Sequence, residues 1–118
     1  MLTRLALMVG VVGGVLTAVG CSSSTSPSNT CGASGAAANI SAASSNNFAP
    51  ASATITKGQS VCWQNNGSSN HTVTADQGNT FDGELPAGAT FLRAFPTAGT
   101  VAYHCRIHSG MVGTIIVQ

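Results

Sequence analysis

The chain has 118 residues, of which 43% are hydrophobic and only 6% charged, with a formal net charge of +1. Once Arg4 near the N-terminus is set aside, the remaining cations and anions cancel, so the chain lacks the basic surface that nucleic-acid binding requires. We therefore expect no nucleic-acid partner, and protein partners must be recognised mainly through neutral contacts.

Residues 1–20 have the layout of a signal peptide. Arg4 is the single cation, and it precedes an uncharged apolar run over residues 5–19 that is too short to span a bilayer comfortably. The small residues just before Cys21 resemble a bacterial lipobox, which predicts lipidation of Cys21 and attachment to a membrane outside the cytoplasm. The alternative is an ordinary signal peptide cleaved nearby, which would leave Cys21 as a free thiol.

Residues 21–35 are rich in serine and contain little that could be buried, so we expect them to form a flexible tether. Residues 36–118 are numerous enough for one hydrophobic core. The sequence thus predicts one folded domain, expected to be a monomer, at the end of a tether.

The domain shows no helical period and many short β-branched runs separated by turn residues, which predicts an all-β fold. The predicted strands cover residues 37–41, 53–56, 60–64, 71–75, 90–95, 101–105 and 113–117. Alternation along strands assigns Val61 and Trp63 to the core and Cys62 to the opposite face. By the same rule Tyr103 shares the face of Cys105, while His104 points outward.

Arg93 does not fit this alternation, because it falls on the same side as Phe91 and Phe95. A buried guanidinium without partners is very costly. We expect Arg93 to lie near a sheet edge, to bond backbone carbonyls, or to be displaced by a bulge.

The segment from Cys105 to Met111 contains a thiol, the imidazole of His108 and a thioether. A strand that leads into a tight loop can direct all three toward one point, and His71 at the start of another strand can supply a fourth ligand. One Cys, two His and a weak Met form the ligand set of a blue-copper electron-transfer site. Zinc fits less well, because structural zinc sites use paired ligand spacings and no Met.

These residues resemble the cupredoxins, the plastocyanin-like blue copper proteins. The matching segments are residues 57–61, Trp63, Asn65, Asn66 and residues 71–74, 98–100 and 105–113. The spacing Cys-x2-His-x2-Met resembles that of amicyanin. The resemblance implies a Greek-key β-sandwich of about seven to eight strands and one mononuclear copper bound by His71, Cys105, His108 and Met111.

Two residues depart from the family pattern. Thr72 stands where an Asn that braces the ligand loop is common, and Cys62 occupies a strand position where Thr or Val is expected. Cys62 and Cys31 are most simply explained as a disulfide, with two separate thiols as the alternative. Met111 could also be a core residue that fills space beside a three-ligand site.

The resemblance implies a carrier of single electrons outside the cytoplasm rather than an enzyme. The ring edge of His108 is the expected electron port, surrounded by an apolar docking patch of Ile107, Gly110, Met111 and Val112 that redox partners contact transiently. A copper carrier without redox duty uses the same ligands and is the main alternative. A small oxidase or reductase would need an open coordination position, and a structural surface protein would need no metal.

Overall fold

The computed structural model describes residues 31–78 and 80–118, which form a short 3-10 helix and nine β-strands. The elements are η1 (Cys31–Ala33), β1 (Ala38–Ala43), β2 (Asn47–Ala49), β3 (Ser52–Ile55), β4 (Ser60–Asn65), β5 (His71–Ala75), β6 (Asp82–Leu85), β7 (Thr90–Ala94), β8 (Gly99–His104) and β9 (Val112–Val117). The predicted signal peptide, the lipidation site Cys21 and residues 21–30 of the predicted tether lie outside the described residues. Within those residues, no helix has the length and apolar character needed to cross a membrane.

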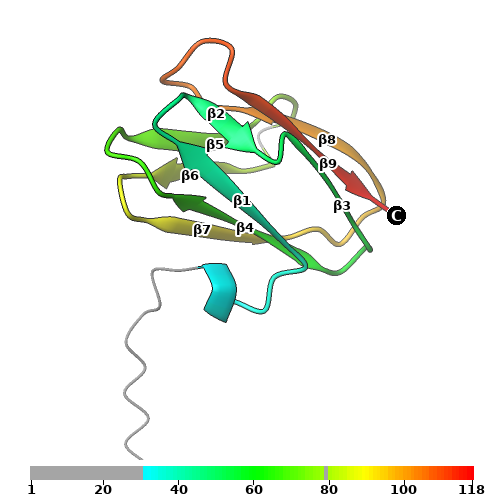
Figure 1. The fold of residues 1–118 in the computed structure, drawn as a ribbon. Helices are drawn as coiled ribbons and strands as arrows, with labels where there is room; N and C mark the ends of the chain where they lie inside the picture. The colour runs from blue at the N-terminus through cyan, green and yellow to red at the C-terminus, as the bar shows by residue number, and fades with distance from the viewer. Residues whose placement is uncertain (1–30, 79) are drawn as a thin grey trace, which may run out of the picture.

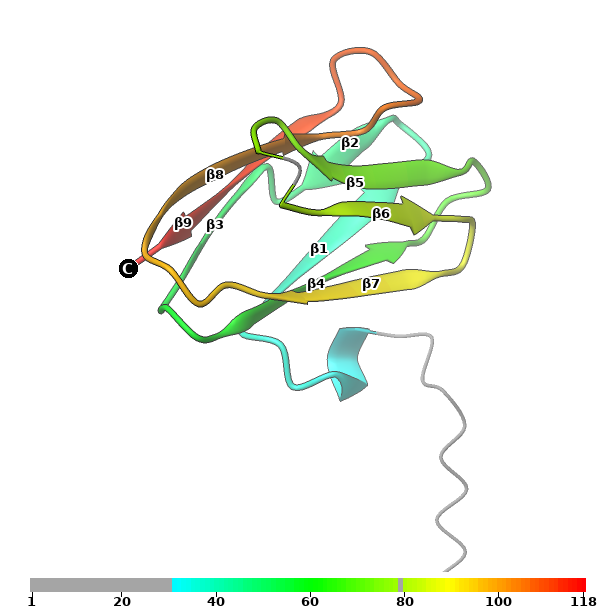
Figure 2. The same cartoon turned by 180° about the vertical axis from the view of Figure 1, so that it is seen from behind.

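The strands form two sheets that pack face to face (Figures 1 and 2). One sheet has the order β2-β1-β4-β7 and the other has the order β3-β9-β8-β5-β6. The β1–β4 and β3–β9 pairs are parallel, and the other pairs are antiparallel. The chain crosses between the sheets several times, so the predicted all-β sandwich is confirmed.

All seven predicted strands are present, with ends that differ by at most two residues. The sequence pattern missed β2 and β6. β2 is only three residues long, and β6 reads Asp-Gly-Glu-Leu, a composition with low β-propensity. β6 forms because it lies at a sheet edge, where Asp82 and Glu84 face solvent while Gly83 and Leu85 are buried.

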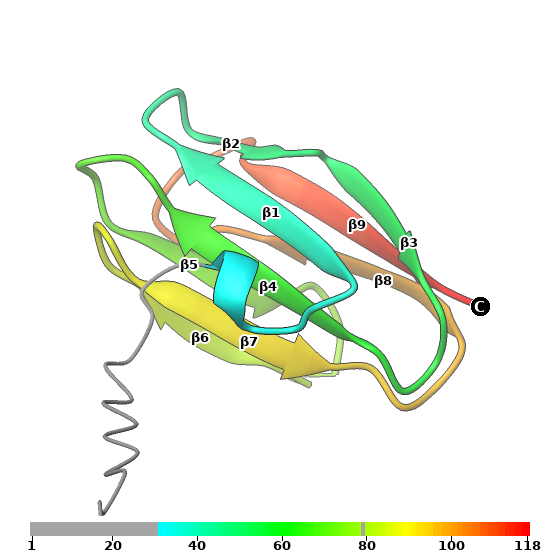
Figure 3. The same ribbon diagram turned by 60° about the horizontal axis from the view of Figure 1, so that its bottom comes forward.

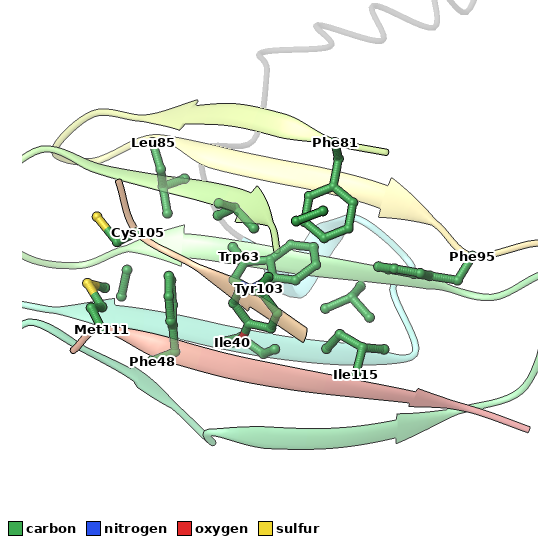
Figure 4. Close-up of a cluster of buried hydrophobic side chains, with 14 of the residues drawn as sticks. Ile40, Phe48, Trp63, Phe81, Leu85, Phe95, Tyr103, Cys105, Met111 and Ile115 are labelled. Atoms are coloured by element: carbon green, nitrogen blue, oxygen red, sulfur yellow. The ribbon is translucent and has the colours of Figure 1, made fainter. Parts of the chain in front are cut away.

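Trp63 on β4 lies at the centre of the core between the two sheets (Figure 4). Its ring meets Tyr103 of the opposite sheet edge to face, with centroids 5.3 Å apart, and also packs near Phe81, Phe91 and Phe95. Val61 and Trp63 are buried in this core as predicted. The aromatic cluster fills most of the sandwich, and Cys105 and Met111 close one end of it.

Tyr103 is fully buried, and burial raises the pKa of its phenol to about 12. The ring lies directly over Gly113, its partner across the β8–β9 ladder, where a Cβ would overlap the phenol ring. Gly113 therefore creates the space that Tyr103 occupies.

Replacing Gly113 with alanine is expected to lower the free energy of unfolding by about 2–3 kcal/mol, because the new methyl group overpacks a ring that cannot move. Denaturant unfolding followed by tryptophan fluorescence measures this change. Gly58→Ala is not a suitable control because its φ is +89°, so Gly32→Ala, which meets no atom within 4 Å, serves instead. A Gly113→Ala protein as stable as the Gly32→Ala protein would contradict the prediction.

Arg93 lies on β7, which is an edge strand. This agrees with the first of the three expectations, a position near a sheet edge. Its guanidinium carbon is 4.9 Å from the centroid of the Phe81 ring and 5.9 Å from that of Phe95. The aromatic faces attract the cation while its stem covers apolar surface. This packing explains how a guanidinium shares a strand face with two aromatic residues.

Cys31 and Cys62 form a disulfide, as predicted. Cys62 points to the outer face of β4, away from the core that holds Trp63, and Cys31 begins the 3-10 helix η1. Figure 3 shows η1 lying against the sheet that contains β1, β4 and β7. The covalent bond therefore joins residues that the predicted boundary placed in the tether to a central strand of the domain.

Candidate metal centre

β5 pairs antiparallel with the end of β8, with Thr74 opposite His104, so the start of β5 lies beside the residues that follow β8. His71 is the first residue of β5, and Cys105 follows the last residue of β8. The loop between β8 and β9 then carries His108 and Met111 back over this end of the sandwich, at the top of Figure 2. Topology alone thus gathers all four predicted ligands at one end of the molecule.

The three strongest candidate ligands converge on one point. The ligand atoms of His71, Cys105 and His108 all lie within 4.8 Å of one another. The two Nδ1 atoms are 3.1 Å apart, and the Cys105 Sγ is 4.0 Å from the Nδ1 of His71 and 3.6 Å from that of His108. Such separations between donors are those expected when one ion sits between them.

Met111 lies at the same end of the core and is only 1% exposed. In Figure 4 the sulfur atoms of Cys105 and Met111 are found together at this end. The Met111 carbonyl accepts a hydrogen bond from the Cys105 amide at 2.9 Å, and its own amide donates to the His108 carbonyl at 3.4 Å. These backbone bonds close the loop and hold the thioether beside the thiol.

Burial lowers the pKa of His71, and the nearby His108 ring acts in the same direction, while the backbone at Ala43 opposes both. The folded protein therefore favours the neutral imidazole, which is the form that binds a metal. The Thr72 amide donates to the Cys105 Sγ at 3.4 Å. A hydrogen bond of this kind orients a metal-binding sulfur.

Asn65 shapes the loop that leads into His71, a role that the sequence pattern did not reveal. Its Nδ2 donates to the carbonyls of Ser69 and Leu85 at 2.7 and 2.9 Å, and its Oδ1 accepts from the Gly67 amide at 2.9 Å. Asn65 is fully buried, so these bonds replace water completely. The only sequence signal at this position was an Asn that follows a predicted strand and matches the cupredoxin pattern.

Replacing Asn65 with alanine is expected to lower the free energy of unfolding by about 2–3 kcal/mol, because the buried Leu85 carbonyl and the partly buried Ser69 carbonyl lose their donor. The same change loosens the loop that carries His71, so copper affinity should also fall. Calorimetric unfolding and a copper titration measure the two effects. Asn66→Ala removes a single exposed bond to Ser41 and is the matched control; equal effects of the two changes would contradict the prediction.

Thr72 braces the ligand loop, although it stands where the cupredoxin pattern commonly has an Asn in that role. Its Oγ1 accepts a hydrogen bond from the Arg106 amide at 2.8 Å, which ties β5 to the residue after Cys105. The Arg106 side chain reaches across to β6, where Nε donates to Asp82 at 2.9 Å and Nη2 to Glu84 at 2.8 Å. The backbone bond to the buried Thr72 therefore holds the start of the ligand loop, whereas the ion pairs of the Arg106 side chain are exposed and contribute little.

The surface around the centre agrees with the predicted docking patch except at one residue. Ile107 and Val112 are 53% and 59% exposed, and His108 is half-buried. The assignment of Met111 to this patch is wrong, because its side chain turns into the core. His104 points away from the centre as predicted and pairs with Asp76 at 2.6 Å.

The donor set fits copper. Thiolate and thioether sulfur are soft ligands that suit Cu(I), and imidazole nitrogen suits both oxidation states. The described residues contain one group of three or more His, Cys, Asp or Glu side chains close enough to share a metal, and it is this one.

Comparisons with known proteins agree with this fit. Residues 36–118 match the family model described as copper binding proteins, plastocyanin/azurin family. A plastocyanin from Scenedesmus fuscus is 37% identical over 89 residues, which covers 60% of this chain and 86% of that protein.

Two solved structures share the fold. A purple cupredoxin from Nitrosopumilus maritimus has a TM-score of 0.64 and 26% identity, covering 69% of this chain and 99% of its own. An oxidised amicyanin variant has a TM-score of 0.66 and 25% identity, covering 73% of this chain and 85% of its own. The fold, the donor set and the family match agree, and copper is the cofactor they imply. This chain belongs to the plastocyanin/azurin family of copper-binding proteins.

Proposed function

We propose that the protein is a type 1 (blue) copper protein that carries single electrons between redox partners outside the cytoplasm. The observation that supports this most strongly is the convergence of His71, Cys105 and His108 within 4.8 Å. These three residues would hold the copper, with Met111 as a weak axial ligand. When bound, copper supplies reversible one-electron chemistry.

The role of the polypeptide in electron transfer is to hold the ligands in nearly fixed positions. His71 and Cys105 sit at the ends of paired strands, and the loop that carries His108 is closed by hydrogen bonds between backbone groups. Ligands held on rigid elements cost little reorganisation when the charge of the site changes. A site built in this way suits repeated electron exchange better than release of the metal.

His108 is the proposed electron port, because it is a proposed ligand that is only half-buried, whereas His71 and Cys105 are buried. The exposed residues of the proposed docking patch are Ile107 and Gly110 on the same loop and Val112 at the start of β9, and Ile107 and Val112 are more than half exposed. An apolar patch beside a neutral surface suits brief contacts with redox partners. No enzymatic activity is proposed, in keeping with the match to the plastocyanin/azurin family.

The location follows from the sequence rather than from the fold. We propose export of the chain, lipidation of Cys21 and attachment to a membrane by the serine-rich tether. The Cys31–Cys62 disulfide supports an oxidising compartment. Mass spectrometry of the protein from membranes tests this directly, since an unmodified Cys21 in the mature protein would contradict lipid anchoring.

A copper titration followed by electron exchange tests the electron-carrier function. The protein should bind one Cu(II) with an intense blue absorption band, and reduced and oxidised protein should exchange electrons without losing metal. A copper carrier would instead release the metal to a chelator faster than it exchanges electrons. A protein that binds copper without a blue band would overturn the blue-copper proposal.

Introducing a like charge into the docking patch is expected to slow electron self-exchange by about tenfold or more, because two patches must meet. Ile107→Glu is the test variant. Leu92→Glu is the matched control, because Leu92 is 52% exposed on β7 and Ile107 is 53% exposed. Nuclear magnetic resonance line broadening gives both rates; equal rates would exclude Ile107 from the docking patch.

A further inference from the structure

A chain of hydrogen bonds runs from the ligand loop to the edge strand β6. The Arg106 amide donates to Thr72 Oγ1 at 2.8 Å, and Thr72 Oγ1 lies 3.0 Å from Thr74 Oγ1. The Thr74 hydroxyl donates in turn to Asp82 Oδ1 at 2.8 Å. The same Oδ1 accepts from the Arg106 side chain at 2.9 Å, which closes the chain into a ring.

The direction of every bond in this ring follows from its two ends. The Thr74 proton goes to the Asp82 carboxylate, so the Thr74 oxygen is free to accept, and the Thr72 hydroxyl must donate to it. Thr72 oxygen can then accept from the Arg106 amide. Hydrogen bonds aligned in one direction and ending on a charge strengthen one another.

The hydroxyl part of this ring is buried. Thr72 is 1% exposed and Thr74 is 8% exposed, although both face outward from the sandwich core. Neither hydroxyl can exchange its partner for water without cost. Asp82 therefore does more than form a surface ion pair with Arg106. It is also the acceptor at the end of the chain that contains both buried hydroxyls.

We propose that Asp82 and Thr74 are positioning residues for the Cys105 thiolate. They act through Thr72, whose hydroxyl they orient and whose amide donates to the Cys105 Sγ at 3.4 Å. Hydrogen bonding at the Cys sulfur is one of the features that tune the potential of a blue-copper site. Asp82 on an edge strand thus helps to set the redox potential, an inference that rests on the proposed electron-carrier function.

Thr74→Val tests the ring without changing its charge or its volume. Without the hydroxyl, Thr72 loses its acceptor and the amide bond to the thiolate weakens. The reduction potential should therefore shift downward, and the copper–sulfur stretching frequency should change. Thr74→Ser restores the hydroxyl and should return both values toward those of the wild type.

Asp82→Ala and Glu84→Ala form a matched pair, since each removes one exposed carboxylate that pairs with Arg106. Only Asp82 also accepts from Thr74. Asp82→Ala should change the copper–sulfur stretching frequency as Thr74→Val does, while Glu84→Ala should leave it unchanged. Equal effects of the two carboxylate variants would show simple electrostatics and overturn the proposal.

Copper-free protein gives an independent test. Amide hydrogen exchange at Arg106 should be about fivefold faster in Thr74→Val, the equivalent of losing roughly one neutral hydrogen bond. Glu84→Ala should leave this exchange rate unchanged. Wild-type exchange in Thr74→Val and in Asp82→Ala, together with unchanged potentials, would overturn the positioning role.

The electron-carrier function and the positioning role of Asp82 and Thr74 can be disproved separately. Absence of a blue band in the wild-type protein would defeat the electron-carrier function, and with it the role in setting the potential. A normal blue band in the wild type with unaltered variants would defeat the positioning role alone.

Discussion

Replacing Cys105 with serine is expected to abolish the intense blue band and to weaken copper binding by more than about a hundredfold. Loss of a residue that only orients a ligand commonly costs a metal site 10–100-fold, roughly, and loss of the thiolate itself should cost more. Serine presents a hard oxygen that stays protonated, whereas the Cys105 thiol is readily deprotonated by a metal. Absorption spectra and a competitive copper titration measure both changes.

The matched control for this change is His104→Gln, the residue immediately before Cys105. His104 points away from the centre and pairs with Asp76, so its replacement should leave the blue band intact. Serine is close in size to cysteine, so the Cys105→Ser protein should remain folded, which circular dichroism checks. An intense blue band in folded Cys105→Ser protein would show that another residue supplies the sulfur ligand.

Removing the Cys31–Cys62 disulfide is expected to lower the free energy of unfolding by about 3–4 kcal/mol. The bond joins residues separated by 31 positions, and the loop-closure estimate for a ring of that size gives this amount. Cys62 faces away from the core, so the copper spectrum should not change. Denaturant unfolding of a Cys31→Ala, Cys62→Ala double variant measures the loss.

A reductant provides the control for this second prediction. It should lower the stability of the wild-type protein to that of the double variant, and it should not affect the double variant. If the double variant matched the stability of the oxidised wild type, the disulfide would contribute nothing to stability. A change in the blue band on removing the disulfide would also be unexpected, and it would show that η1 influences the metal centre.

The strands that carry the site could be predicted from the sequence because their residues alternate strongly. The strand around Trp63 and the strand that ends before Cys105 both show an apolar face with a two-residue period, and both are present. β6 could not be predicted in this way, because Asp82 and Glu84 have low β-propensity. It exists because neighbouring strand β5 offers a free edge, which is a property of the assembled sheet.

The ligand residues were predictable for a different reason. Cys105, His108 and Met111 are close in the sequence, so a short loop brings them together in almost any sandwich of this kind. His71 lies more than thirty residues earlier, and its assignment rested on its place at the start of a predicted strand, with support from the resemblance to the cupredoxins. The pairing of β5 with β8 is what places its ring near the thiol.

The sequence by itself determined an all-β domain, its main core residues and a copper-type ligand set. The tertiary structure decided the stacking of Arg93 on Phe81, the burial of Met111 and the hydrogen-bonded ring that ends on Asp82. The physical reason is the separation along the sequence over which each kind of interaction acts. Alternation and loop spacing are local properties of the chain, whereas a hydrogen bond from Thr74 to Asp82 or a cation over a ring depends on which strands become neighbours.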